Sequence, residues 1–189
     1  MRKLVYYVGT SLDGYIAGPG GEFDFYPLSD EMAAWINARY PETVPTHLRE
    51  AAGIDAAPNR RFDTVIMGLG TYRPAYDHGI TQPYAHLRQI VVSSTLDSPD
   101  PAVEVVAADP LRRVRDLKSE DGADVWLCGG GVLAGALLSE IDDIVVKRYP
   151  VVAGSGRPMI DGPFSPTAFR PTDSTSFDNG ALVTWFERA

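Results

Sequence analysis

The stretch Val125-Trp126-Leu127-Cys128-Gly129-Gly130-Gly131-Val132-Leu133-Ala134-Gly135-Ala136-Leu137-Leu138 organises this chain. It begins with an apolar run short enough to be a buried strand, passes through three glycines, and ends in small and apolar residues that predict a helix. This order places backbone N–H groups where they can face an anion such as a pyrophosphate. Glycine accepts backbone angles closed to other residues and lets a ligand approach the main chain. A full dinucleotide fingerprint is absent, so the residues alone fit a ligand-binding turn and a plain turn equally well.

The composition limits the class of protein. A length of 189 residues suits a single domain spanning 1–189. The net charge of -8 argues against a nucleic-acid partner, which would require a basic face. Cys128 is the only cysteine, so neither an internal disulfide nor a cysteine metal cluster is expected, and we predict no metal site. Because no apolar run reaches roughly 18 residues and no signal peptide follows Met1, we expect a cytoplasmic protein without a membrane partner.

Strands and helices are predicted to alternate along the chain. Apolar, β-branched runs predict strands at 4–9, 15–17, 64–68, 89–92, 103–106, 125–128 and 141–149. Ser29 and Asp109 are typical helix N-caps, and Pro110 suits the first helical position. Two runs about an Asp178-Asn179-Gly180 turn predict a C-terminal β-hairpin within 167–188. We therefore expect an α/β fold with a mainly parallel sheet and an antiparallel edge.

Segment 40–61 interrupts this alternation. It is richer in proline, alanine and charge than its surroundings, and we expect a looping excursion with a short helix around 46–52. The excursion either covers the active site or meets another subunit.

Small and polar residues follow several of the predicted strands. Asp13 either forms an ordinary Asp-Gly turn or points its carboxylate into a pocket. Gly68 and Gly70 allow close approach of an anion, and Thr71 can cap the helix that begins there. The hydroxyls of 93–95 either bind phosphate or ribose, or form a solvated loop with local hydrogen bonds.

Four segments in this order resemble the dihydrofolate-reductase fold, in its riboflavin-biosynthesis reductase (RibD C-terminal domain) branch. They are Ser11-Leu12-Asp13-Gly14-Tyr15-Ile16-Ala17, Val65-Ile66-Met67-Gly68-Leu69-Gly70-Thr71-Tyr72, Val91-Val92-Ser93-Ser94-Thr95-Leu96 and Leu127-Cys128-Gly129-Gly130-Gly131. The later segment 150–156 is also similar to that branch. The resemblance covers nearly the whole chain and implies a three-layer α/β/α architecture.

The resemblance implies NADPH bound across the carboxyl edge of the sheet. The pyrophosphate falls to Gly129, Gly130 and Gly131, with Val132 and Leu133 at the helix start. Further phosphate and adenosine contacts fall to Gly68, Gly70, Thr71, Ser93, Ser94 and Thr95. Thr10, Ile16 and Ala17 would line the nicotinamide pocket, with Asp13 near the substrate. The chain has Leu69 and Gly70 where the family usually has a basic residue for the 2′-phosphate, so NADH or a deazaflavin stays open as the hydride carrier.

A proton donor and a substrate contact are also expected. In folate-reducing relatives the donor is an acid on the first helix, which corresponds to Asp30 here, although Ser29 or Glu31 also fit the alignment. The alternative for Asp30 is a favourable placement at the positive end of the helix dipole. Arg157 or Lys147 would serve a substrate phosphate, or each is a surface charge.

These residues favour an NAD(P)H-dependent reductase of the riboflavin-biosynthesis type, 5-amino-6-(5-phosphoribosylamino)uracil reductase-like, acting on a pyrimidine, pteridine-like or ribosylamino substrate. The zinc deaminase pattern of the bifunctional pathway enzyme is missing. One alternative is a dihydrofolate reductase, and another is a non-catalytic protein that binds a nucleotide cofactor. Relatives often dimerise, and we expect a homodimer with Trp185 and Phe186 packed against the second subunit.

Overall fold

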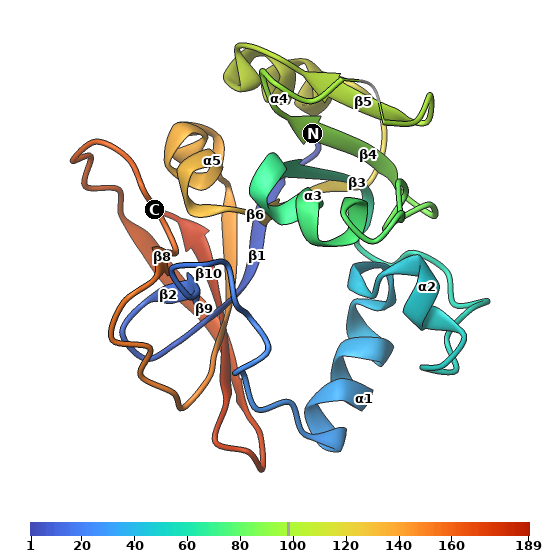
Figure 1. Ribbon diagram of the computed structural model, residues 1–189. Coiled ribbons are helices and arrows are strands. Elements are labelled where there is room, and N and C mark those ends of the chain that lie inside the picture. The colour runs from blue at the N-terminus through green and yellow to red at the C-terminus, as the bar shows by residue number, and fades with distance from the viewer. Residues whose placement is uncertain (98) are drawn as a thin grey trace.

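The computed structural model describes residues 1–97 and 99–189, in which eight strands form one twisted sheet (Figure 1). Their order across the sheet is β5-β4-β3-β6-β1-β7-β10-β9. The strands are β1 Leu4–Thr10, β3 Phe62–Gly68, β4 Arg88–Val92, β5 Val103–Val106, β6 Asp124–Gly129, β7 Asp143–Arg148, β9 Phe169–Ser176 and β10 Leu182–Arg188. The pairs from β5 to β7 are parallel, and β10 is antiparallel to both neighbours. The predicted mainly parallel sheet with an antiparallel edge hairpin is confirmed.

Helices cover both faces of the sheet, as a three-layer architecture requires. They are α1 Asp30–Arg39, α2 Thr46–Arg49, α3 Leu69–Tyr76, α4 Pro110–Ser119 and α5 Gly131–Ala136, with short 3-10 turns η1 Pro41–Thr43 and η2 Leu138–Glu140. In Figure 1, α1 and α2 lie together at the lower right, away from α4 and α5. Among the helices of the described residues, none has the length and apolar character needed to cross a membrane.

The two faces bury two separate cores, because successive strand side chains point in opposite directions. Tyr7 packs with Trp126 on the α1 face, whereas Tyr6 packs with Leu127 on the face covered by α4 and α5. A continuous apolar run such as 4–8 is therefore buried on both sides, as expected of a central parallel strand.

The local helix signals act largely as the sequence predicts. The Ser29 hydroxyl accepts a hydrogen bond from the Met32 N–H, and the Asp109 carboxylate accepts one from the Arg112 N–H. The expected cap by Thr71 is wrong, because α3 begins at Leu69 with Gly68 as its N-cap residue. The Thr71 side chain is instead free to face a cavity.

The excursion at 40–61 is tied down at both ends. The buried Glu42 carboxylate accepts hydrogen bonds from the N–H groups of Arg61 (2.7 Å) and Phe62 (3.0 Å). Arg49 donates from its buried guanidinium to the carbonyl oxygens of Pro41 and Ala57. The helix expected around 46–52 is present but shorter, because α2 ends at Arg49.

The C-terminal hairpin packs into the same core as the excursion. Trp185 is 8% exposed, and its indole N–H donates to the Tyr40 hydroxyl at 2.8 Å. Its ring also makes edge contact with Trp35, at 5.7 Å between ring centroids. Trp185 is therefore not available for the subunit contact expected from the sequence. Phe186, on the opposite face, is partly buried against the second core, and the homodimer itself stays a prediction.

We predict that Tyr40→Phe lowers the free energy of unfolding by about 1–3 kcal/mol, because it leaves the buried Trp185 N–H without an acceptor. Urea unfolding followed by tryptophan fluorescence measures this loss. The matched control is Tyr76→Phe, at a residue that is 38% exposed. An equal, small effect of both substitutions would contradict the proposed role of the Tyr40–Trp185 hydrogen bond.

Candidate active site

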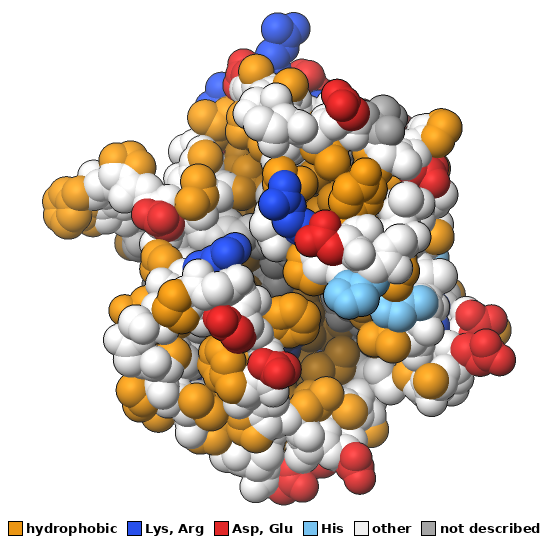
Figure 2. Space-filling view, viewed as in Figure 1, with side chains coloured by type: hydrophobic (Ala, Val, Ile, Leu, Met, Phe, Trp, Pro, Cys, Tyr) orange, Lys and Arg blue, Asp and Glu red, His pale blue; other side chains and the backbone are white. Residues whose placement is uncertain are grey.

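A cavity of about 1200 Å³ opens at the carboxyl ends of β1, β3 and β6. Figure 2 shows it as a hollow in the middle of one face, with hydrophobic side chains on its floor and basic, acidic and histidine side chains around it. Ligands of open α/β sheets bind at this edge. Because pockets for one drug-sized ligand measure roughly 300–1000 Å³, this cavity has room for a cofactor together with a substrate.

One half of the cavity is lined by glycine main chain. Gly129 ends β6 and Gly130 is the N-cap residue of α5, and both lie opposite Thr71 of α3. A Cβ atom built on Gly129 would lie 3.5 Å from the Thr71 hydroxyl oxygen, and one built on Gly130 would lie 3.7 Å from it. Gly129 has a φ of +135°, which favours glycine, whereas Gly130 has an ordinary extended backbone. At Gly130 the φ is one that other residues adopt, and the missing side chain leaves space in front of Thr71.

Gly131 is a glycine for a different reason. A Cβ there would lie 2.1 Å from the carbonyl oxygen of Pro158, so a side chain would collide with backbone. The three glycines therefore have two roles. Gly131 allows close packing against Pro158, whereas Gly129 and Gly130 leave a stretch of main chain open to the cavity, which we call the cradle. The helix that follows has only six residues, so the cradle depends on exposed main chain more than on a helix dipole.

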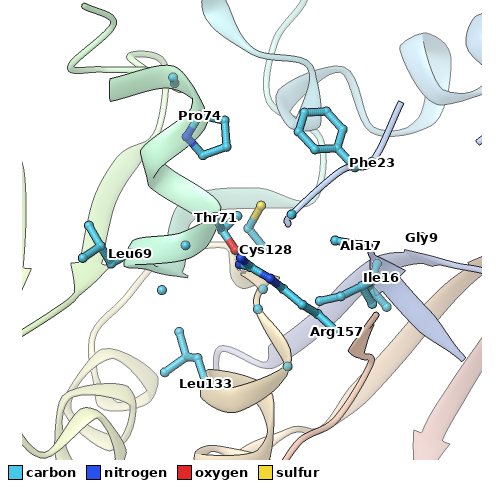
Figure 3. Close-up of a pocket in the computed structure, with 18 of the residues that line it drawn as sticks. Gly9, Ile16, Ala17, Phe23, Leu69, Thr71, Pro74, Cys128, Leu133 and Arg157 are labelled. Carbon is cyan, nitrogen blue, oxygen red and sulfur yellow. The ribbon is translucent and has the colours of Figure 1, made fainter. Parts of the chain in front are cut away.

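The facing wall comes from a small second sheet. Strand β2 (Tyr15–Ala17) pairs with β8 (Arg157–Pro158), which brings Ile16, Ala17 and Arg157 to the cavity. Figure 3 shows the Arg157 side chain extending across the cavity toward Thr71. A Cβ built on Gly70 would lie 3.1 Å from Nη1 of Arg157. The position that lacks a basic residue in sequence therefore has one beside it in space.

A smaller hollow of about 360 Å³ adjoins this place. Arg73 and Arg157 both line it, together with Gly70 and a single carboxylate, Asp77. The two guanidinium groups leave the hollow with a net positive charge, which suits a phosphate. Sequence spacing gives no sign of this pairing.

The other half of the cavity is aromatic. Tyr7, Tyr26, Tyr84, Trp126 and Tyr149 line it, and the rings of Tyr26 and Tyr149 stack at 4.7 Å between centroids. Flat apolar walls of this kind suit a planar ring system and exclude water.

Lys147 and Cys128 add two titratable side chains to this aromatic half. The Nζ of Lys147 lies 3.9 Å from the centroid of the Tyr7 ring, so Lys147 is not the surface charge considered from the sequence. Burial lowers the pKa of Lys147 to about 8. Burial raises the pKa of the Cys128 thiol to about 12, which keeps this cysteine protonated and inert as a nucleophile at neutral pH.

The structure brings most of the predicted cofactor residues together. Those that line the cavity are Ile16, Ala17, Gly68, Gly70, Thr71, Gly129, Gly130, Gly131, Val132 and Leu133. Thr10 is buried and outside the lining. Ser93, Ser94 and Thr95 also lie outside it, and the Ser93 hydroxyl accepts the N–H groups of Thr95 and Leu96. Ser93 therefore forms local hydrogen bonds within its loop, which was the second of the two interpretations of residues 93–95.

The two predicted catalytic acids do not reach the cavity. The Asp13 carboxylate accepts hydrogen bonds from the Ala153 N–H (3.0 Å), the Gly154 N–H (2.7 Å) and the Ser11 hydroxyl (2.6 Å). These bonds, with that of Ser11 the strongest, lower the pKa of Asp13 to about 2. Asp13 is thus an anion that holds a loop, and it does not point into the cavity as considered from the sequence.

Asp30 is exposed at the first position of α1 and is also outside the cavity lining. Its neighbour Glu31 accepts the Asp178 N–H, and Ser29 caps the helix. The placement of Asp30 fits the helix-dipole alternative, because acids stabilise the positive end of a helix.

We predict that Asp13→Asn destabilises the protein only where the carboxylate is ionised. The folded-state pKa lies below the ordinary value of 3.8, so the stabilisation is complete above pH 3.8 and disappears as pH falls toward 2. Melting temperatures of both proteins between pH 2 and 7 measure the difference, with Asp116→Asn on α4 as the exposed control. A difference that stays constant down to pH 2 would show that the charge does not hold the loop.

Comparison with known proteins identifies the family. The family model of the RibD C-terminal domain matches residues 2–183. The uncharacterized protein YwjB of Bacillus subtilis (strain 168) is 30% identical over 161 residues, which cover 84% of this chain and 82% of YwjB.

Solved structures share the fold. A protein from Shewanella sp. PV-4 matches with a TM-score of 0.72 and 24% identity, over 100% of this chain and 99% of that one. Dihydrofolate reductase from Enterococcus faecalis, complexed with NADP(H) and RAB-propyl, matches at 0.64 and 13%, over 98% and 96%. The diaminohydroxyphosphoribosylaminopyrimidine deaminase/5-amino-6-(5-phosphoribosylamino)uracil reductase of Thermotoga maritima matches at 0.65 and 14%, over 100% of this chain and 57% of that one. The chain belongs to the RibD C-terminal domain family.

Proposed function

We propose that this protein is an NAD(P)H-dependent reductase that transfers a hydride to a planar, ribosylamino-pyrimidine-like substrate. The observation that carries the proposal is the two-part cavity, in which a glycine-lined half meets an aromatic half at one sheet edge. The fold of the Enterococcus faecalis enzyme holds NADP(H), and the Thermotoga maritima enzyme is a 5-amino-6-(5-phosphoribosylamino)uracil reductase, which supports the cofactor and the substrate class.

The residues present fit a dinucleotide. Gly129 and Gly130 leave main chain open to a pyrophosphate, and the Thr71 hydroxyl faces them across the cradle. Ile16 and Ala17 would hold the nicotinamide ring between the two halves of the cavity, as the resemblance implies. A reduced nicotinamide supplies the hydride when bound. The protein then contributes orientation and the exclusion of water, which its apolar walls provide.

The lining of the cavity also bears on the two alternative functions, a dihydrofolate reductase and a cofactor-binding protein without turnover. A dihydrofolate reductase was favoured by an acid on the first helix, and Asp30 lies outside the cavity. That alternative therefore loses its supporting residue. A cofactor-binding protein without turnover is an outcome of the experiment below, in which cofactor binds but no probe is reduced.

We predict that Gly130→Val raises the dissociation constant of NADPH at least about 100-fold, because the added side chain fills the space in front of Thr71. The backbone at Gly130 has an ordinary φ of -92°, so the variant is expected to fold. Calorimetric titration measures the affinity, and circular dichroism checks the fold. Ala34→Val, on the exposed side of α1, is the control. Unchanged affinity in a folded Gly130→Val protein would remove the glycine turn from the site.

Turnover is measured separately with the wild-type protein. Oxidation of NADPH is followed with 5-amino-6-(5-phosphoribosylamino)uracil and with dihydrofolate as probes.

We predict that Arg157→Met weakens NADPH binding about tenfold and leaves NADH binding nearly unchanged. The guanidinium near Gly70 would contact the 2′-phosphate, and a hydrogen bond between charged groups contributes about 1.5 kcal/mol, which corresponds to about tenfold. Titration of each cofactor at low and moderate salt measures the effect. Arg112→Met, on the exposed side of α4, is the matched control. An equal loss for both cofactors would show that Arg157 does not read the 2′-phosphate.

A further inference from the structure

Lys147 occupies an unusual position at the floor of the aromatic half. It lies on β7 directly opposite Gly9 of β1, and side chains two residues apart on a strand point to the same face. Lys147 therefore follows Val145 on the α1 face, whereas Gly9 places no side chain beside it. The ammonium group lies over the Tyr7 ring, 3.9 Å from its centroid, and lines the cavity.

Within residues 1–97 and 99–189, the charge of Lys147 lacks a carboxylate partner, in contrast to the other two lysines of the chain. Lys3 pairs with Asp143 at 3.1 Å, and Lys118 pairs with Asp142 at 2.8 Å. Among the described residues, no carboxylate forms an ion pair with Lys147. Burial lowers the pKa of Lys147, and the nearby Cys128 thiol raises it by a smaller amount. An ammonium in an apolar wall is unfavourable unless an occupant of the cavity supplies a lone pair or a negative charge.

A second polar group near Lys147 is also without a partner in the described part of the chain. The Tyr7 hydroxyl is buried and makes no hydrogen bond there, although buried polar groups are usually paired. Tyr7 and Lys147 belong to adjacent strands and line the same cavity. That hydroxyl is covered by protein, so of the two groups the Lys147 ammonium is the one that faces the cavity, where a ligand can supply an acceptor atom.

The neighbouring titratable groups leave Lys147 as the group able to exchange a proton near neutral pH on this floor. Burial raises the pKa of Tyr26 and of Tyr149 to about 12, and raises those of Tyr7 and Tyr84 well above their usual value. Cys128 stays protonated for the same reason. His47 of α2, His78, which follows α3, and Asp161 are exposed residues of the cavity lining outside this floor, and Arg148, the next residue on β7, is also exposed.

We propose that Lys147 is the proton donor of the reductase and that the substrate is a planar molecule whose C=N bond, which a ribosylamino compound carries in its ring-opened imine form, lies against the Tyr7 face. This inference rests on the proposed function. The hydride of the reduced nicotinamide adds to the carbon, and the π electrons of the C=N bond move to the nitrogen. The nitrogen takes a proton from the Lys147 ammonium, which becomes a neutral amine and recovers a proton from water. The products are the secondary amine and the oxidised nicotinamide.

Kinetics of Lys147→Met and Lys147→Arg test the proposal with 5-amino-6-(5-phosphoribosylamino)uracil as the probe. We expect the single-turnover rate to fall at least about 100-fold in both variants, because methionine has no proton to give and arginine does not release one near neutral pH. NADPH affinity is expected to stay within about twofold of wild type, since general acid catalysis acts on the chemical step. Lys118→Met is the matched control with wild-type rates. A wild-type rate in Lys147→Met would overturn the proposal.

The pH profile separates a proton donor from a structural residue. In the wild type we expect kcat/KM, which reports the ligand-free protein, to fall as pH rises through about 8, where Lys147 loses its proton. This alkaline limb is expected to persist in His47→Gln and to disappear from the residual rate of Lys147→Met. A limb that follows His47 would assign the proton to the histidine and overturn the proposal.

Nuclear magnetic resonance distinguishes failure of this inference from failure of the proposed function. With three lysines in the chain, ε-13C-lysine labelling gives three signals, and Lys147→Met assigns one of them. The same uracil probe and dihydrofolate are each added to the NADP⁺-loaded protein, which cannot turn over. A shift of the Lys147 signal, and a rise of its titration midpoint, supports the contact even where the wild type reduces neither probe. A Lys147 signal that ignores both probes overturns the inference even where turnover proves the reductase.

Discussion

The close approach of two strand-to-helix turns is the constraint on which this structure depends. Strands β3 and β6 pair in parallel, so the helices that follow them, α3 and α5, begin at the same edge of the sheet. A Cβ built on Gly68 would lie only 3.7 Å from the backbone nitrogen of Gly130. Side chains at these positions would fill the space between the turns. Glycine on both sides leaves main-chain groups open to the cavity, and a ligand with many acceptor oxygens can approach them.

The walls of the cavity come from segments that pack against this edge for reasons of their own. The β2–β8 ribbon brings Arg157 over α3, and the tied excursion at 40–61 brings α2 to the opposite side. The register of β7 with β1 places Lys147 in the wall of the cavity. A chain with a net charge of -8 therefore places cations in and around its cavity. Such local charge matters for a phosphorylated or acceptor-rich ligand more than the net charge does.

Polar residues beside the motifs show where reasoning from sequence reaches its limit. Asp13 and Ser93 both follow strands, and both carry oxygen atoms suited to a ligand. In the fold each satisfies nearby backbone N–H groups instead. Both uses need the same residue type at the same place in the sequence, because short polar side chains form local turns as readily as they bind ligands. Only the direction of the side chain separates the two uses.

The sequence by itself determined the α/β class, the parallel sheet with its antiparallel hairpin, the helix caps at Ser29 and Asp109, and the glycine positions of the cradle. These features depend on local periodicity, capping and backbone freedom, which neighbours in the chain decide. Tertiary structure alone decided that Arg157 stands beside Gly70, that Lys147 lies under the cavity and not on the surface, and that Asp13 and Asp30 stay outside it. These facts depend on strand register and on the packing of distant segments, and no short stretch of sequence encodes them.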